Sequence, residues 1–494
     1  MSKKKKVIVV GSGNAALCAG IAALEKGAEV LIVEKANEKE AGGNSRYTAG
    51  AMRFVYNSNE ELIPLLLDPD DEKLANTDFG SYSREKFQAD LLGFNNGLPL
   101  SLHQHLLIDK SYETLKWLGE QGIKFEPIYS RQSFEKDGKY IFWGGLTLAA
   151  QGEGVGLVET ELQAFLRLGG QIQYETAAKQ LVLDGQQICG LICDAPQGEI
   201  TIAADAVVLG CGGFEANPAL RRKYMGEKWV QAKVRGTRHN LGKGIEMALE
   251  AGAQFHGVPD GCHATPMDLH MPNYGNLEIP YIERKHYRKI CYFLGVMLNA
   301  KGERFEDEGV NFRNYTYAQF GRSILHQPGG FAWQIFDQKV EHLLYSEYRF
   351  WDASFVEANT LEGLVEQLEG VDQQKALQTL KAYNAAVDTD TPFDPTILDG
   401  KSTQGLQPNK TNWANTLDTP PFKAYPVTCG ITFTYGGLKV NRGAAVLKDN
   451  DEPIPGLFAC GELVGGVFYN GYPGGSGLTS GAVFGRLAGY SAAL

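Results

Sequence analysis

The pattern of apolar and polar positions near the N-terminus predicts one βαβ unit. Residues 6–10 are rich in β-branched side chains and predict a short strand. A glycine-containing turn over 11–14 leads into an alanine-rich stretch over 15–26, which predicts a helix. Gly27 is suited to end that helix, and residues 28–34 predict a second strand.

The remainder of the chain changes character twice. Residues 158–209 alternate between helical and strand patterns. Beyond them the chain becomes rich in aromatic residues, proline and asparagine, and near Thr428 a glycine-rich strand-and-turn pattern returns. We therefore predict an α/β fold in which a Rossmann-type nucleotide-binding domain consists of two segments, with a second, α+β domain inserted between them. The expected boundaries are 1–257 and 431–494 for the first domain and 258–430 for the inserted domain.

Length and charge agree with this picture and exclude some classes of partner. The chain has 494 residues, of which 43% are hydrophobic, enough for two cores. The net charge is -11 and the one dense basic run is residues 3–6, which excludes nucleic acid as a partner because phosphate binding needs a concentrated basic face. No stretch reaches about 18 uninterrupted apolar residues, so we expect no membrane span.

The eight cysteines are scattered, without a CxxC or CxxCH pattern. Such spacing is typical of reduced thiols in a cytoplasmic protein and predicts no metal site, iron–sulfur cluster or covalent haem. Any redox cofactor is therefore expected to be held without cysteine ligands.

The turn after the first predicted strand has the chemistry of a dinucleotide site. Gly11 permits a tight turn, Gly13 lets the backbone approach a pyrophosphate, and the following helix offers unpaired N–H groups. Glu34 ends the second strand, where its carboxylate can meet a ribose hydroxyl. The predicted cofactor residues in this unit are Gly11, Gly13, Asn14, Ala15, Glu34 and Lys35.

Three further glycine-rich segments specify a flavin. They are residues 42–45, the strand and turn at 455–462, and the turn at 474–481, which leads into a helix and can direct N–H donors at the flavin ring. The cofactor residues predicted in these segments and just after the first of them are Gly43, Asn44, Ser45, Ala49, Gly50, Gly461, Glu462, Gly477, Leu478 and Thr479.

Taken together, these segments resemble the fumarate reductase and succinate dehydrogenase flavoprotein superfamily over nearly the whole chain. Within it, residues 11–18, 425–437 and 472–477 look most like the tricarballylate dehydrogenases. The resemblance implies that the Rossmann-type domain is an FAD-binding domain and that the inserted α+β domain is a mobile capping domain, with substrate between them. It also implies oxidation of a saturated tricarboxylate to cis-aconitate, with electrons passed to an external, membrane-bound redox partner. Members that attach FAD covalently use a histidine near residues 44–50, and here none is present, so we expect non-covalent FAD.

The resemblance also suggests catalytic residues. The family's proton donor or acceptor is an arginine beyond an Asn-x-x-Gly-x-Arg-Phe segment, matched here by residues 299–305 and then by Arg313, displaced by one residue. Arg304 is expected to be structural, paired with Glu306 or Asp307. His263 approximates the histidine at the entry to the cap.

Departures from the family bear on the substrate. Fumarate reductases carry a histidine pair where this chain has Thr432 and Phe433, and a clamping arginine where it has Tyr472. A four-carbon dicarboxylate is therefore not expected. The predicted catalytic residues are Arg313, Tyr472 and His263, and the predicted substrate contacts are Arg238, His239, Thr265, Thr432, Thr434 and Tyr435.

The proton acceptor, the direction of the reaction and the class of protein leave alternatives open. Arginine is nearly always protonated, so Tyr435, Tyr472 or Tyr315 is the alternative acceptor. Tyr472 is also reminiscent of 3-ketosteroid Δ1-dehydrogenases, which makes a steroid-type or other enoate oxidoreductase the rival enzyme. The rival of another class is a flavin-free binding protein on the same scaffold, as in GDP-dissociation inhibitors of small GTPases.

Overall fold

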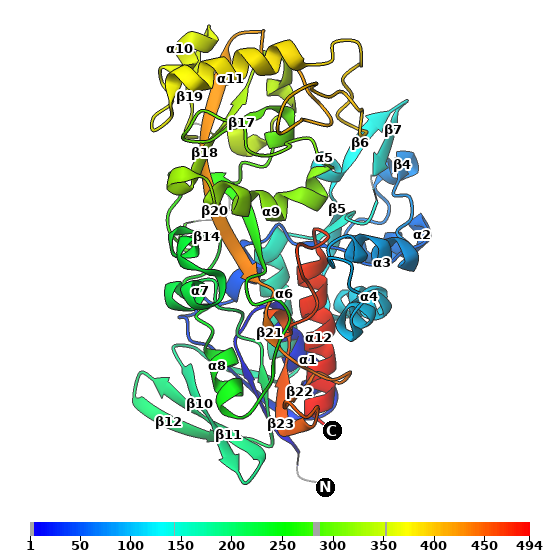
Figure 1. Ribbon diagram of the computed structural model, residues 1–494. Helices are drawn as coiled ribbons and strands as arrows, with labels where there is room; N and C mark the ends of the chain where they lie inside the picture. The colour runs from blue at the N-terminus through cyan, green and yellow to red at the C-terminus, as the bar shows by residue number, and fades with distance from the viewer. Residues whose placement is uncertain (1–3, 143, 280–286, 351–352) are drawn as a thin grey trace.

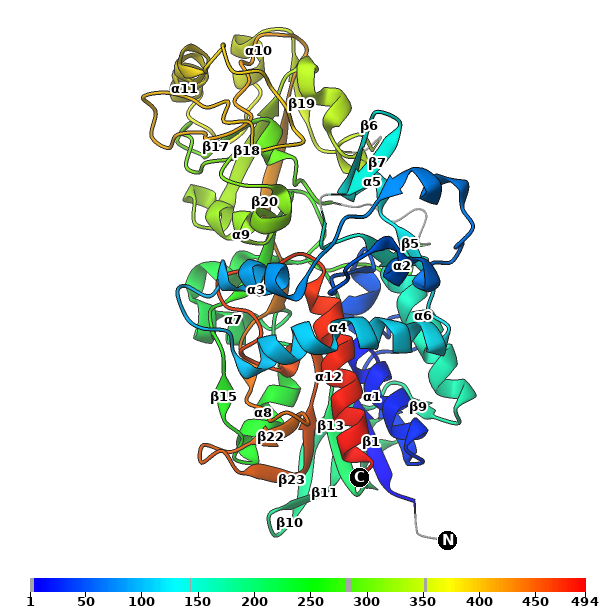
Figure 2. The ribbon, with the colours of Figure 1, turned by 90° about the vertical axis from the view of Figure 1, so that its right-hand side faces the viewer.

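The computed structural model describes residues 4–142, 144–279, 287–350 and 353–494. Figure 1 shows a lower part that contains both chain ends, an upper part, and a smaller group of strands and helices to one side. Figure 2, turned by 90°, shows helices α4, α12 and α1 lying over the lower part.

The lower part is built on a six-stranded sheet in the order β22-β23-β13-β1-β2-β9. Its central strands β13, β1, β2 and β9 run parallel, β23 joins them in parallel, and only β22 is antiparallel. The predicted Rossmann-type α/β fold is confirmed, and the βαβ unit lies within one residue of its predicted bounds. The strands are β1 (Lys6–Val10), β2 (Glu29–Val33), β9 (Gln171–Gln173), β13 (Ala206–Leu209), β22 (Ala445–Leu447) and β23 (Pro453–Ala459).

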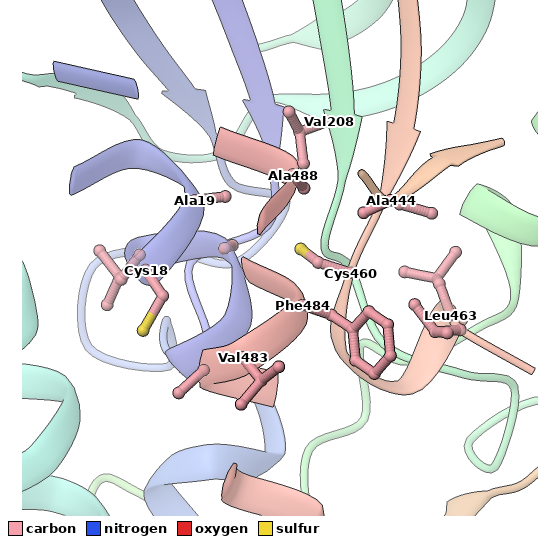
Figure 3. Packing of buried hydrophobic residues seen from close by; sticks show 14 of the residues in the cluster. Cys18, Ala19, Val208, Ala444, Cys460, Leu463, Val483, Phe484 and Ala488 are labelled. Carbon is pink, nitrogen blue, oxygen red and sulfur yellow. The ribbon is translucent and has the colours of Figure 1, made fainter. Parts of the chain in front are cut away.

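Two helices from opposite ends of the chain pack on this sheet at close range. A Cβ atom on Gly485 of α12 (Ser476–Ala492) would lie 2.3 Å from the carbonyl oxygen of Ala15 on α1 (Asn14–Glu25). On the next turn, a Cβ on Gly489 would lie 2.1 Å from the oxygen of Ala19. Figure 3 shows small side chains such as Ala19 and Ala488 at this contact. This close packing sets the first turn of α12 beside the glycine turn before α1.

Further elements complete the lower part. Helices α4 (Leu102–Gln121) and α6 (Glu153–Arg167) pack near α1 and α12, and α7 (Pro218–Met225) and α8 (Lys243–Glu250) follow β13. An antiparallel three-stranded sheet consists of β10 (Ala177–Asp184), β11 (Gln187–Ala195) and β12 (Gly198–Ala203), and β15 (Phe255–His256) pairs with β21 (Gly437–Leu438).

The upper part is the cap, and a mixed sheet with helices forms it. Its strand order is β14-β20-β18-β17, and β16 and β19 also pair with β20. The long strand β20 (Phe422–Thr434) descends from the cap into the lower part in Figure 1. The other elements are β14 (Lys233–Val234), β16 (Cys262–Asp268), β17 (Val296–Leu298), β18 (Phe331–Phe336), β19 (Val356–Ala358), α9 (Arg313–Leu325), α10 (Leu361–Val365) and α11 (Gln373–Ala386).

The cap sheet uses residues on both sides of the expected boundaries. Strand β14 precedes residue 258, and β20 crosses residue 430. The two parts are thus joined through continuous strands, which carry residues of the cap sheet to the edge of the lower sheet.

The group of elements to the side was not predicted from the sequence. It contains two small sheets, β3-β8-β5 and β4-β7-β6, with helices α2, α3 and α5. The bounds are β3 (Ala51–Met52), β4 (Thr77–Asp78), β5 (Phe125–Pro127), β6 (Ser133–Lys136), β7 (Lys139–Phe142), β8 (Leu148–Ala150), α2 (Asn59–Leu62), α3 (Arg84–Leu92) and α5 (Tyr129–Gln132). Across the residues that the structure describes, no helix is both long and apolar enough to cross a bilayer.

Candidate active site

A cavity of about 640 Å³ runs from the carboxyl ends of β1, β2 and β13 to the underside of the cap. Ligands of open parallel sheets bind at this edge, where loops follow the strands. Residues from the lower sheet, the cap and the side group all line the cavity. Because different parts of the molecule line its two ends, the ends differ in chemistry. We call them the cofactor end, at the sheet, and the cap end.

At the cofactor end, the first glycine turn is held in the geometry that dinucleotide sites need. Gly11 has φ +100°, and a Cβ there would lie 2.7 Å from the carbonyl oxygen of Gly210. The Ser12 hydroxyl donates to Glu34 Oε2 at 2.6 Å, which fixes the carboxylate at the end of β2. The Asn14 backbone N–H donates to Ser45 Oγ at 3.1 Å, and the Asn14 side chain donates to the Leu478 carbonyl at 2.9 Å. The separate glycine-rich segments therefore meet around one space.

Most of the predicted cofactor residues line this cavity. They are Gly11, Gly13, Asn14, Ala15, Glu34, Lys35, Gly43, Asn44, Ser45, Ala49, Gly461, Glu462, Gly477 and Leu478. Two predicted residues, Gly50 and Thr479, lie behind the residues that line the cavity. Gly50 has φ +66° and packs against the backbone of Glu153, and the Thr479 hydroxyl donates to the Gly475 carbonyl at 3.4 Å.

The cofactor end fits FAD. The N-termini of α1 and α12 both face it, and such termini favour the negative charge of a pyrophosphate or a reduced flavin. Ser476, the first residue of α12, has a buried hydroxyl without a hydrogen-bond partner in the described chain. The close contacts around Gly11 leave no room for side chains that would block the approach of a ligand.

At the cap end, four aromatic side chains form what we call the aromatic wall. The rings of His263 and Phe433 stack at 5.5 Å with 11° between their planes. Tyr317 and Tyr472 stand edge-on to His263 at 5.0 and 5.1 Å, and their phenolic oxygens lie 2.7 Å apart. All four line the cavity. The wall combines strands β16 and β20, helix α9 and the turn before α12.

Burial sets the protonation of the aromatic wall. It lowers the pKa of His263 well below the ordinary value, and the charge of Arg235 adds to the effect. Neither ring nitrogen of His263 has a hydrogen-bond partner among the described residues. Burial, followed by the contact with Tyr317, raises the pKa of Tyr472 well above its ordinary value. His263 is thus a neutral ring, and Tyr472 holds its phenolic proton.

Arg313 is the first residue of α9 and lines the cap end. Its guanidinium lies 5.0 Å from the centre of the Tyr345 ring. Burial alone would lower the pKa of Arg313, but neighbours led by Tyr345 raise it above the ordinary value. Arg313 is therefore a permanent cation in the cavity, which suits it to hold an anion and not to accept a proton.

Two more arginines line the same end and were not predicted. Arg288 donates to Glu347 at 2.8 Å, and Arg235 lies 3.4 Å from the Thr432 hydroxyl. The sequence offered no spacing that singled out either arginine. Tyr317 was also missed, although it follows Arg313 by four residues and so shares its face of the helix.

The predicted substrate contacts divide into two groups. His239 and Thr432 line the main cavity, with His239 Nε2 at 3.2 Å from Glu40. The other four do not. Arg238 has a side chain that is 56% exposed, and it pairs at 3.5 Å with Glu40, which itself lines the cavity. Thr265 is buried in β16 behind the wall.

Thr434 and Tyr435 line a second cavity of about 50 Å³ behind the aromatic wall. The backbone N–H and the hydroxyl of Thr434 donate to Glu462 Oε1 at 2.7 and 2.9 Å, so this threonine holds a cofactor-end residue. Of the three tyrosines proposed as proton acceptors, only Tyr472 lines the main cavity, because Tyr315 lies outside it, 3.4 Å from Asp90.

Arg304 is structural, but its partner differs from the expected ones. Its guanidinium donates to both carboxylate oxygens of Glu308, at 3.1 and 2.5 Å, inside the cap. Glu306 accepts from Arg304 through its backbone oxygen, at 3.3 Å, and not through its carboxylate.

The chain matches the FAD binding domain family over residues 6–478. It is 26% identical to the NADH:fumarate oxidoreductase of Klebsiella pneumoniae (strain 342), over 99% of this chain and 48% of that protein. It is 27% identical to the NADH:acrylate oxidoreductase of Vibrio harveyi, over 98% of this chain and 50% of that protein. The chain thus spans about half the length of these curated relatives.

Solved structures show the same fold. The open conformation of a flavocytochrome c3 fumarate reductase matches with a TM-score of 0.73 at 25% identity, over 100% of this chain and 78% of that one. The 3-ketosteroid Δ1-dehydrogenase of Sterolibacterium denitrificans matches with a TM-score of 0.75 at 21% identity, over 99% of both chains, which speaks for the fold alone. The chain belongs to the FAD binding domain family and to the superfamily of fumarate reductase and succinate dehydrogenase flavoproteins.

Proposed function

We propose that the protein is an FAD-dependent oxidoreductase acting on a carbon–carbon bond beside a carboxylate. The observation that carries the proposal is one continuous cavity. Its cofactor end is lined by the residues suited to FAD, and its cap end by Arg313 and the Tyr317–Tyr472 pair. An anion-binding cation and a proton-holding phenol stand where a substrate would meet the cofactor.

FAD bound at the cofactor end supplies the transfer of two electrons to or from carbon. Glu34 is placed for the ribose, the turn at Gly11 to Asn14 for the pyrophosphate, and the N-terminus of α12 for the ring. Binding is non-covalent in this proposal, because residues 44–50 contain no histidine.

Tyr472 is our candidate for proton transfer. Its raised pKa keeps the proton on the phenolic oxygen at neutral pH, which favours donation to a substrate carbon over abstraction from one. The hydroxyl of Tyr317 at 2.7 Å can orient that proton. These properties favour reduction of a double bond as the easier direction.

Arg313 is our candidate for holding the substrate carboxylate. A guanidinium offers a planar fork of N–H donors that matches a carboxylate, and its charge is permanent here. A carboxylate held beside the double bond also withdraws electrons from it, which assists addition at the far carbon.

The aromatic wall bears on the substrate class. Tricarballylate, the substrate that the resemblance implies, carries three carboxylates, and each needs charge-assisted hydrogen bonds to offset its desolvation. The ring of Phe433 supplies none, and the neutral ring of His263 offers a single N–H donor. These rings favour an enoate with one carboxylate and a flat apolar body, which we propose as the second candidate. Fumarate and acrylate appear in the names of the two relatives above.

The electron partner is proposed to be external to this chain. The sequence contains one dinucleotide-binding turn, which FAD occupies in this proposal, and the relatives named for NADH are about twice as long. A separate redox protein or a separate domain would exchange electrons with the bound flavin.

Anaerobic flavin spectroscopy tests the proposal. Chemically reduced protein is mixed with fumarate, acrylate, aryl-substituted acrylates, cis-aconitate and a 3-keto-Δ1 steroid, and oxidised protein with their saturated counterparts. We expect a carboxylate to change the flavin oxidation state faster than the steroid, with the aryl-substituted acrylates fastest. Fastest reaction with cis-aconitate or tricarballylate would favour the tricarboxylate. A response to the steroid alone would overturn the carboxylate assignment.

A further inference from the structure

Two glutamate side chains meet behind the cofactor end of the cavity. Glu215 follows the glycine turn after β13 and is fully buried. Glu462 belongs to the short 3₁₀ helix η10 (Gly461–Leu463) and lines the cavity. A Cβ on Gly213 would lie 2.1 Å from Glu462 Oε1, so a side chain at this turn would displace the carboxyl group.

Side-chain donors around this pair point at one oxygen of each carboxyl group. Asn44 and Asn240 both donate their side-chain amides to Glu215 Oε1, each at 2.6 Å. Thr434 donates its N–H and its hydroxyl to Glu462 Oε1. Glu215 Oε2 is buried, and no donor reaches it among the described residues. The carboxyl group of Glu462 is the side-chain hydrogen-bond partner of the Glu215 carboxyl group.

Two ionised carboxylates in such contact repel each other at low dielectric, and a proton between them removes the repulsion and supplies the missing donor. Burial, followed by the charge of Glu462, raises the pKa of Glu215 well above its ordinary value, and burial raises that of Glu462. Other titratable groups acting on the pair are the Arg221 guanidinium on α7 and the Cys211 thiol, whose pKa burial raises to about 12.

We propose that Glu215 and Glu462 share one proton, and that Glu215 is a positioning residue that holds Glu462 and Asn44 against the cofactor. The protonated carboxyl of one glutamate donates to the other, so that the pair carries a single negative charge. No bond other than this hydrogen bond forms, and the proton comes from water.

The same network ties the cofactor turn to the base of the cap. The Asn44 amide that donates to Glu215 also donates to the carbonyl of Thr432 on β20 at 2.6 Å. Asn44 Oδ1 accepts from the backbone N–H of Thr237 at 2.9 Å, three residues after β14. Glu215 therefore holds the side chain of Asn44, and Asn44 connects the segment 42–45 to β20 and to the residues that follow β14.

Dissociation constants of FAD from the apoprotein test the positioning role without any substrate. Glu215→Gln keeps an acceptor for the two asparagines and a permanent donor for Glu462, so we expect its affinity to stay within about threefold of the parent protein. Glu215→Ala leaves the amides and Glu462 without partners, and we expect affinity to fall by about tenfold or more. Equal affinity in Glu215→Ala, or an equal loss in Glu215→Gln, would overturn the proposal.

Infrared spectra of the holoprotein at about pH 8 test the shared proton and do not depend on Glu215→Ala folding. A free glutamate is ionised at that pH. We expect the parent protein to have a carboxylic-acid C=O band that Glu215→Gln removes and Glu462→Gln shifts or removes. Glu161→Gln is the matched control. Glu161 is buried on α6 with a pKa raised by burial, and it lies outside the cavity. It should remove a different band and leave FAD affinity unchanged. An unchanged spectrum in Glu215→Gln would overturn the shared proton.

Discussion

The phenolic oxygens of Tyr317 and Tyr472 lie 2.7 Å apart, although one belongs to cap helix α9 and the other to the turn before α12. This hydrogen bond crosses between the two parts of the molecule. The contact thus joins the candidate proton donor to a residue of the cap.

Replacing Tyr472 with Phe should lower the rate of substrate-dependent flavin oxidation by about 10²–10⁴-fold, the usual range for losing a positioned acid. The ring still packs against His263 and Phe468, so FAD content should not change. Stopped-flow absorbance gives the rate, and Tyr469→Phe, three residues away and outside both cavities, is the control. A rate like that of the parent protein would move the acid to another residue.

FAD should leave the protein on denaturation. Residues 44–50 contain no histidine, so nothing in this segment matches the family's covalent attachment. After acid precipitation the yellow colour is expected in the supernatant, with the absorbance of free FAD. Colour retained in the washed pellet would establish a covalent bond.

The cofactor end could be predicted from the sequence because its chemistry is local. A tight turn, an acidic strand end and a helix N-terminus within about thirty residues leave few alternatives, and Gly11 and Glu34 lie where such a unit requires. The turn at Gly477 was found for the same reason. Gly50 and Thr479 were included by their position next to such segments and lie one layer behind them.

The cap end could not be predicted, because distant segments form it. Arg235 and Arg238 are three residues apart, and only the pairing of β14 with β20 decides that the first faces the cavity. The side group between residues 51 and 150 was missed because its strands are two to four residues long, too short for an alternating pattern to be recognised.

Replacing Arg313 should weaken the use of a carboxylate substrate strongly. Arg313→Ala removes a partly buried cation and its fork of donors, and we expect kcat/KM to fall by about 10²–10³-fold or more. Arg313→Lys keeps the charge without the planar fork and should fall between Arg313→Ala and the parent protein. Arg322→Lys is the control, because Arg322 lies on the same helix and contacts the Asp260 carbonyl outside the cavity. Unchanged kcat/KM in Arg313→Ala would exclude a role in binding or catalysis.

Replacing His263 with Phe should make the protein more resistant to acid. The folded pKa of His263 lies well below 6.5, so below about pH 6.5 the unfolded chain gains a proton that the folded protein does not. The parent protein therefore loses up to about 1.4 kcal/mol of stability per pH unit as pH falls through this range, until the folded pKa is reached.

Phenylalanine can stack on Phe433 as the histidine does, and it does not titrate. Melting temperatures of His263→Phe and the parent protein should thus diverge in favour of the variant as pH falls. His270→Asn, with a side chain 69% exposed in the parent, should follow the parent curve. Parallel curves for His263→Phe and the parent would mean that His263 is protonated in the folded protein.

Substrate binding should depend on Arg235 and not on Arg238. Arg235 lines the cap end beside Thr432, and its charge also acts on His263 and Tyr472. Arg238 is mostly exposed and pairs with Glu40, although the sequence alone had favoured it as a substrate contact.

A charge-assisted hydrogen bond contributes about 1.5–3 kcal/mol, so Arg235→Ala should raise the dissociation constant of a bound carboxylate by about tenfold or more. Arg238→Ala loses only an exposed pair, which contributes about 0–1 kcal/mol, and should bind like the parent protein. Anaerobic titration of oxidised protein with an unsaturated carboxylate, followed by the flavin spectrum, measures both constants. The reverse order of effects would place the carboxylate at the Glu40 side of the cavity.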